Sequence, residues 1–274
     1  MNILHNPPSI EKLKEAQIRL KYEELFAFMF KINYLREQNH QEKAGLARDI
    51  QKDDVQKFID TLPFSLTGDQ LKTVWEVVDD LNASKRMNRI IQGDVGSGKT
   101  IVSIIAMYAN YLSGYQSALM APTEILAKQH YDNVCNILKD TGIRVVLLTG
   151  SMTKKEKQVI YDQLGSGEVS IAVGTHALIQ DDVHYQNLGL VITDEQHRFG
   201  VNQRANLKNK GLRPDVLYMS ATPIPRTYAL TLYGDMDVSI IKEMPKGRKP
   251  VKTYVKSESE IKDVLTMMLE AVSY

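Results

Sequence analysis

A glycine-rich segment that ends in a lysine and a hydroxyl residue is the clearest sign of chemistry in this 274-residue sequence. Residues 93–100 read Gly-Asp-Val-Gly-Ser-Gly-Lys-Thr and match the phosphate-binding loop (P-loop) pattern. A strand-like run with Ile90 and Ile91 precedes the loop and a helical pattern follows it, as a P-loop requires. Lys99 is expected to contact the β- and γ-phosphates of ATP, and Thr100 to bind Mg²⁺. The predicted nucleotide-binding residues of the loop are Gly93, Asp94, Val95, Gly96, Ser97, Gly98, Lys99 and Thr100.

Two adjacent carboxylates supply the second half of an ATP-hydrolysing site. Asp194 and Glu195 directly follow the apolar run 190–193. We expect Asp194 to hold Mg²⁺ through water, as acidic residues at such sites usually do, and Glu195 to orient and deprotonate the attacking water. Acidic residues are common in strand-end loops, and it is the P-loop upstream that gives this pair its meaning. The predicted catalytic residues are therefore Glu195, Lys99 and Asp194.

A glutamine lies about one helix before the P-loop. The side chain of Gln70 carries both a donor and an acceptor, so it can recognise the edge of adenine. The competing interpretation is an exposed glutamine in the first turn of a helix whose N-cap is Thr67. We include Gln70 among the predicted nucleotide-binding residues.

The elements that must position these residues are short β-rich runs alternating with helix-length segments. Apolar strands joined by helices predict an α/β fold with a mostly parallel central sheet. Ligands of such sheets bind at the carboxyl ends of the strands, where the P-loop and the acidic pair both fall. The expected strands are residues 89–92, 118–121, 145–149, 170–174, 190–193, 217–220 and 238–241.

The amino-terminal part has a different pattern. Apolar residues recur at helical spacing over residues 10–36, in one helix or two, with Ser9 as the N-cap. A polar loop is expected over residues 37–44 and a shorter helix over 55–62. The predicted domains are a helical connector (1–62), an ATP-binding domain (63–242), and a linker with the start of a second motor domain (243–274).

Composition excludes several classes of protein. The formal charge is +1 and the single cysteine is Cys135, so neither a strongly basic surface nor a disulfide framework is expected. No apolar run has the length of a membrane span, and the first residues do not resemble a signal peptide. A cytoplasmic protein without a membrane partner is the expectation.

Four further strand-end motifs resemble those of superfamily 2 helicases of the DExH type. They are residues 121–124, 149–151, 174–176 and 220–222, in the order that this family shows. The resemblance implies a RecA-like ATPase domain that grips the DNA backbone without reading bases. The implied DNA-binding residues are Pro122, Thr123, Thr149, Gly150, Thr175 and His176, and those coupling hydrolysis to movement are His197, Ser220 and Thr222.

Longer segments are similar to the RecG family of bacterial branch-migration helicases. They are residues 19–26, 194–201, 221–227 and 233–239. This resemblance implies Mg-ATP-driven remodelling of branched or duplex DNA, such as stalled forks and Holliday junctions, in repair and recombination. The transcription-repair coupling translocase is the alternative, since it shares residues 221–227 but typically has Glu in place of Gln196.

A different class of P-loop ATPase is a further alternative. Residues 112–116, Leu-Ser-Gly-Tyr-Gln, resemble a transporter signature but stand too close to the P-loop, so we interpret Gly114 as a glycine that ends a helix.

The RecG resemblance also implies that the chain lacks a wedge domain and most of a second motor domain with its arginine finger. The chain alone is then expected to bind nucleotide but to hydrolyse it poorly. Residues 242–256 contain six basic residues and one acid, and either contact DNA phosphates or form a solvated linker.

Overall fold

Seven parallel strands form one sheet in the computed structural model, which describes residues 7–41, 45–46, 48–194, 214–221, 236–245 and 255–272. The order across the sheet is β3-β4-β2-β5-β6-β1-β7. All seven predicted strands are confirmed, with shifts of one or two residues at their ends. The strands are β1 Asn88–Gly93, β2 Gln116–Met120, β3 Val145–Leu148, β4 Ile171–Gly174, β5 Leu188–Asp194, β6 Asp215–Ser220 and β7 Asp237–Ile241.

The register brings the chemically important strand ends to one edge. Asp194 at the end of β5 is aligned with Met219 of β6, and Ser220 is aligned with Gln92 of β1. The P-loop follows β1, so only β6 separates it from Asp194. Met120 of β2 is aligned with residues at the ends of β4 and β5, which places the segment after β2 at the same edge.

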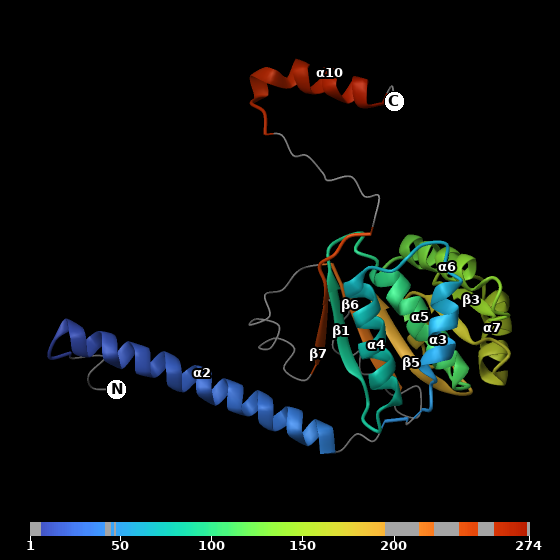
Figure 1. Ribbon diagram of the computed structural model, residues 1–274, viewed down its shortest axis with the longest axis horizontal. Coiled ribbons are helices and arrows are strands. Elements are labelled where there is room, and N and C mark those ends of the chain that lie inside the picture. Colours follow the sequence, from blue (N-terminus) through green and yellow to red (C-terminus); the bar gives the residue numbers. More distant parts are fainter. Residues whose placement is uncertain are drawn as a thin grey trace.

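Helices cover both faces of the sheet, so strand side chains that point to either face are buried. The side chains of Leu119 and Ile192 pack in one apolar cluster with α3, α4, α5 and α6, while Met120 and Val191 pack in another with α7. Figure 1 shows α3, α4, α5 and α6 lying over one face. These helices are α3 Lys52–Asp60, α4 Gly68–Asn82, α5 Lys99–Leu112, α6 Glu124–Leu138 and α7 Lys154–Ser166, with a short 3₁₀ helix, η1 His176–Ile179.

Local chemistry sets where several helices begin and end. Thr67 caps α4 in a capping box with Gln70, and Thr123 caps α6 through the N–H of Leu126. After α5, Gly114 adopts φ +78° and its N–H donates to Tyr111 O, as expected for a helix-ending glycine. The predicted N-caps Ser9 and Thr67 and the interpretation of Gly114 are confirmed.

The amino-terminal pattern forms one helix, α2 Ile10–Gln41, that extends away from the sheet (Figure 1). The predicted loop over 37–44 is wrong as far as Gln41, because residues 37–41 contain no Gly or Pro to stop the helix. Tyr22, Phe26, Phe30 and Tyr34 form a ladder of stacked rings along α2, and all four are more than half exposed.

The second helix of the predicted connector begins at Lys52, earlier than expected, with acidic Asp53 and Asp54 in its first turn. Val55 and Phe58 of this helix, α3, are buried in the same apolar cluster as α4 and α5. The domain boundary at residue 62 stays a prediction. At the other end of the chain, η3 Glu258–Glu260 precedes α10 Ile261–Val272, which lies apart from the sheet in Figure 1.

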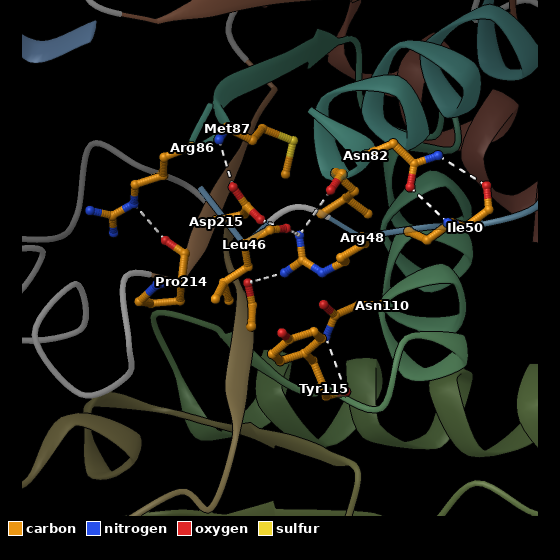
Figure 2. A network of polar contacts seen from close by, with 12 residues as sticks. Leu46, Arg48, Ile50, Asn82, Arg86, Met87, Asn110, Tyr115, Pro214 and Asp215 are labelled. Atoms are coloured by element: carbon orange, nitrogen blue, oxygen red, sulfur yellow. Dashed lines mark hydrogen bonds and ion pairs between the residues drawn. The ribbon is translucent and has the colours of Figure 1, made fainter. Parts of the chain in front are cut away.

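A buried ion pair connects the segment before α3 to the amino-terminal ends of strands in the sheet (Figure 2). Arg48 Nη1 lies 2.5 Å from Asp215 Oδ2 and also donates to Leu81 O at 3.2 Å. Arg48 Nη2 donates to Gly189 O at 2.8 Å, and the N–H of Met87 donates to Asp215 Oδ1 at 2.6 Å. Arg48 therefore joins residues just before α3, the end of α4 and the starts of β5 and β6.

Within the described parts of the chain, no helix is both long enough and apolar enough to cross a membrane.

Candidate active site

The P-loop lies between β1 and α5, as the sequence predicts. Gly96 and Gly98 have φ of +80° and +85°, conformations that residues with a Cβ rarely adopt. At Gly98 a side chain is also excluded because a Cβ would collide with the amide of Gln70. Loops of this type bind phosphate through backbone N–H groups and the positive end of the following helix, and the positive φ values of Gly96 and Gly98 fit such a loop.

Lys99 is folded back over its own loop. Its Nζ donates to Gly93 O at 2.7 Å and to Asp94 O at 2.9 Å. Burial lowers the pKa of Lys99, while the negative charges of Asp194 and Asp94 oppose that shift. A phosphate beside Nζ would supply the charge that two neutral carbonyls do not, so the position suits the predicted phosphate contact.

Gln70 is buried, with an exposed fraction of 3 %. Its Oε1 accepts the N–H of Thr67 at 2.9 Å, and its Nε2 donates to Ser97 O in the P-loop at 2.7 Å. Gln70 therefore joins the first turn of α4 to the phosphate loop, a link that the sequence pattern did not indicate. A carboxamide has two N–H groups and two acceptor sites, so contact with adenine stays a prediction that these bonds permit.

Asp194 is held by a residue that sequence reasoning missed. His130 of α6 places its Nε2 2.8 Å from Asp194 Oδ2. The side chains of His130 and Asp194 are 9 % and 17 % exposed, so the contact is largely screened from water. A histidine on the apolar side of a helix carries no separate sequence signal. The pairing becomes visible only in three dimensions, where α6 packs against β3 and β4 and His130 meets Asp194 at the end of β5.

The donors near the P-loop fit Mg²⁺. Thr100 offers a hydroxyl and Asp194 a carboxylate, and the hard ion Mg²⁺ prefers oxygen ligands. The charge of Asp194 acts on Lys99, so the carboxylate lies within electrostatic reach of the proposed phosphate contact. Among the described residues, no group of three or more His, Cys, Asp or Glu gathers as a metal cage. Mg²⁺ commonly uses one or two protein oxygens together with phosphates and water.

Segments after β2, β3 and β4 form a second cluster at the same edge. Glu124, at the start of α6, accepts the N–H and the hydroxyl of Ser151 at 2.9 and 2.7 Å, which lowers the pKa of Glu124. Lys157 Nζ donates to Gly150 O at 2.8 Å. His176 lies near Gly150. A Cβ atom built on that glycine would be 4.0 Å from the imidazole of His176. Hydrogen bonds thus bring the predicted DNA-contact segments together.

Exposure differs among the predicted DNA-contact residues. Thr123, Gly150 and His176 are exposed, whereas Thr149 and Thr175 are buried. The main-chain N–H of Thr175 donates to Leu148 O at 3.3 Å. We therefore expect the exposed residues to make most of any contact with a DNA backbone, while the two threonines support the loops.

Three predicted residues lie outside the described part of the chain: Glu195, His197 and Thr222. Ser220 is described and is buried at the end of β6, one strand from β1. The role of Glu195 as base and the coupling roles of His197, Ser220 and Thr222 remain predictions.

Comparison with known proteins defines the class that this fold and site belong to. The family model for DEAD/DEAH box helicases matches residues 69–231, and the chain belongs to that family. The predicted RecA-like α/β fold is confirmed, with an all-parallel sheet. At 15 % identity and a TM-score of 0.58, the helicase MrfA bound to DNA shows the same fold.

The individual relatives are RecG proteins, which confirms the resemblance seen in the motifs. The chain is 50 % identical over 254 residues to the ATP-dependent DNA helicase RecG of Bacillus subtilis, and 49 % identical over 271 residues to that of Staphylococcus aureus. The matches cover 93 % and 98 % of this chain but 37 % and 39 % of the relatives, so the chain spans less than half of their length.

A solved structure gives the same result in three dimensions. The structure of RecG bound to a three-way DNA junction is 43 % identical, with a TM-score of 0.85. The superposition covers 97 % of this chain and 36 % of that protein.

Proposed function

We propose that this chain is the ATP-binding part of a RecG-type, ATP-dependent DNA helicase that remodels branched DNA. The observation that carries the proposal is the shared edge of the sheet, where the P-loop, Asp194 and the cluster around Gly150 all lie at carboxyl ends of strands. A nucleotide site and a DNA-backbone site on one rigid sheet are what a DNA-driven ATPase needs. The RecG structure on a three-way junction supports branched DNA as the substrate.

In this proposal the chain's own residues divide the work at the nucleotide. The P-loop N–H groups and Lys99 bind the phosphates, and Gln70 recognises adenine. Thr100 and Asp194 hold Mg²⁺, Asp194 through water, and the ion neutralises phosphate charge when it is bound. Glu195 accepts the proton of the attacking water.

The DNA side follows from the exposed loops. Thr123, Gly150 and His176 present hydroxyl, backbone and imidazole groups that suit phosphate oxygens rather than base edges. Ser220 is the last residue of β6, which lies between the strand of Asp194 and the strand of the P-loop, and Thr222 comes two positions later in the sequence. Ser220 thus lies on the strand between the two halves of the nucleotide site, which supports the proposed role of this segment and of His197 in coupling hydrolysis to movement.

Replacement of Lys99 tests the nucleotide site. Lys99→Ala should weaken Mg-ATP binding by about 10- to 100-fold, because a charged hydrogen bond contributes roughly 1.5–3 kcal/mol. Isothermal titration calorimetry on the purified chain measures this. Lys57→Ala is the control, since Lys57 is exposed on α3 and pairs only locally with Asp54 among the described residues. Equal affinity in wild type and Lys99→Ala would remove the phosphate-contact assignment.

Replacement of Glu195 tests the chemistry. In protein that hydrolyses ATP, Glu195→Gln should retain Mg-ATP binding and lower turnover by about 10²- to 10⁴-fold, since an amide cannot accept the proton. Turnover should be measured with a three-way junction and with linear duplex of equal length. Near-normal turnover in the variant would assign the base to another residue, and equal stimulation by the two DNAs would refute the preference for branched DNA.

A further inference from the structure

We propose that His130 is a positioning residue that orients the Mg²⁺-binding carboxylate of Asp194. The inference rests on the proposed function, because it assumes that Asp194 serves a metal-nucleotide complex. It adds a residue from outside the P-loop and the acidic motif. His130 belongs to α6, and in this part of the chain the sequence predicts DNA contact only for Pro122 and Thr123, which come just before that helix.

The contact has the geometry of a specific hydrogen bond. His130 Nε2 and Asp194 Oδ2 are 2.8 Å apart, although 64 positions separate the residues in the sequence. The main chains are fixed independently, since α6 follows β2 and β2 pairs directly with β5. Neither side chain therefore needs a flexible loop to reach the other.

The chemistry of the pair sets the direction of the bond. A carboxylate can only accept, so the hydrogen lies on Nε2 of His130 and points at Asp194. Nδ1 of His130 is buried, and it has no hydrogen-bond partner among the described residues. The imidazole therefore directs its one satisfied ring nitrogen to the carboxylate. Fixing Oδ2 limits rotation of the carboxyl group and so orients its other lone pairs.

Such support matters for a metal ligand. Carboxylates that bind metals are themselves held by hydrogen bonds, and loss of an outer partner typically weakens metal affinity about 10- to 100-fold. Asp194 ends β5 at the same edge as the P-loop, so rotation of its carboxyl group would change the oxygen that it offers to Mg²⁺ or to a water on the ion. His130 is placed to prevent that rotation.

The same helix connects this carboxylate to the predicted DNA-contact segment. Thr123 caps α6, and Glu124 in its first turn binds Ser151. His130 lies about two helical turns further along. One rigid element thus carries both the DNA-facing loop and the support of the metal ligand.

The test measures metal dependence directly. ATP affinity is titrated by calorimetry with Mg²⁺ and again in EDTA, for wild type, His130→Leu and His130→Gln. His130→Leu fills the buried space without a donor, and His130→Gln keeps an N–H donor at a similar reach. We expect His130→Leu to reduce the gain in affinity from Mg²⁺ about tenfold or more, with little change in EDTA. His130→Gln should retain most of that gain.

Each other outcome counts against the proposal. An unchanged Mg²⁺ effect in His130→Leu, beside a lost effect in Asp194→Asn, would make His130 a packing residue only. An equal loss in His130→Leu and His130→Gln would show that ring shape, not the donor, matters. A wild-type chain that binds no Mg-ATP would refute the proposed function itself, and the inference with it. A melting curve on each variant separates any loss of folding from loss of metal binding.

Discussion

Replacement of Arg48 by methionine should strongly lower the free energy of unfolding, although Arg48 is not part of the nucleotide site. The side chains of Arg48 and Asp215 are 0 % and 2 % exposed, so neither charge can be solvated when its partner is removed. Methionine retains much of the apolar volume and removes the charge and all donors. Leu81 O and Gly189 O each lose a hydrogen bond, and the Asp215 carboxylate loses the guanidinium that pairs with it (Figure 2).

The expected magnitude follows from that burial. Removing one partner of a buried ion pair typically costs about 3–5 kcal/mol in free energy of unfolding. A domain of this size loses about 2–4 °C in Tm per kcal/mol, so we expect a decrease of roughly 6–20 °C. The matched control is Arg144→Met, which breaks an ion pair with Glu168 whose side chains are 64 % and 46 % exposed. An exposed pair contributes about 0–1 kcal/mol, so the control should melt within a few degrees of wild type.

Thermal unfolding followed by circular dichroism, with fluorescence of the single tryptophan, Trp75, as a second probe, measures the difference. Burial raises the pKa of Asp215, while Arg48 opposes that shift. Without Arg48 the folded-state pKa should rise further, so the folded form binds more protons than the unfolded form in the interval between the two pKa values. The stability of the variant should therefore fall as pH rises through that interval. Equal losses for Arg48→Met and Arg144→Met would refute this account of the buried pair.

Three further predictions concern α4 and the P-loop. Asp69 Oδ2 accepts the N–H groups of Lys242 and Glu243 at 2.8 and 3.0 Å, and these bonds lower its pKa from 3.8. Because the folded-state pKa is the lower one, this stabilisation is present above about pH 4 and is lost as pH falls, so the difference in Tm between wild type and Asp69→Asn should shrink from pH 7 to pH 3. Gly98→Ala should weaken Mg-ATP binding at least tenfold in calorimetry, because a side chain is strained at φ +85° and collides with Gln70, whereas Gly142→Ala, also at positive φ but in open space, should leave that binding unchanged. Gln70→Ala should lower Tm through loss of the bonds to Thr67 and Ser97, and should reduce the preference for ATP over GTP in competition binding; a variant that keeps the full preference would exclude Gln70 from base recognition.

Local features of the chain could be predicted from the sequence because they depend on neighbouring residues. The seven strands, the N-caps Ser9 and Thr67 and the helix-ending Gly114 all follow from periodicity or from backbone preferences within a few positions. The P-loop is equally local, since its glycines and Lys99 act within one turn. The end of α2 could not be predicted for a related reason, because a polar helix end resembles a loop when no glycine or proline marks the boundary.

Long-range partnerships required the tertiary structure. His130 meets Asp194 across 64 positions, Gln70 meets Ser97 across 27, and Arg48 meets Asp215 across 167. None of these pairs leaves a sequence signal, because a buried polar residue resembles any other polar residue until its partner is known. The order of strands has the same origin: β1 pairs with β6 and β7 rather than with β2. The sequence by itself thus determined which chemical groups the protein possesses. The packing of helices on the sheet decided which of these groups share a hydrogen bond, because such pairs form where surfaces that are distant in the sequence bury each other.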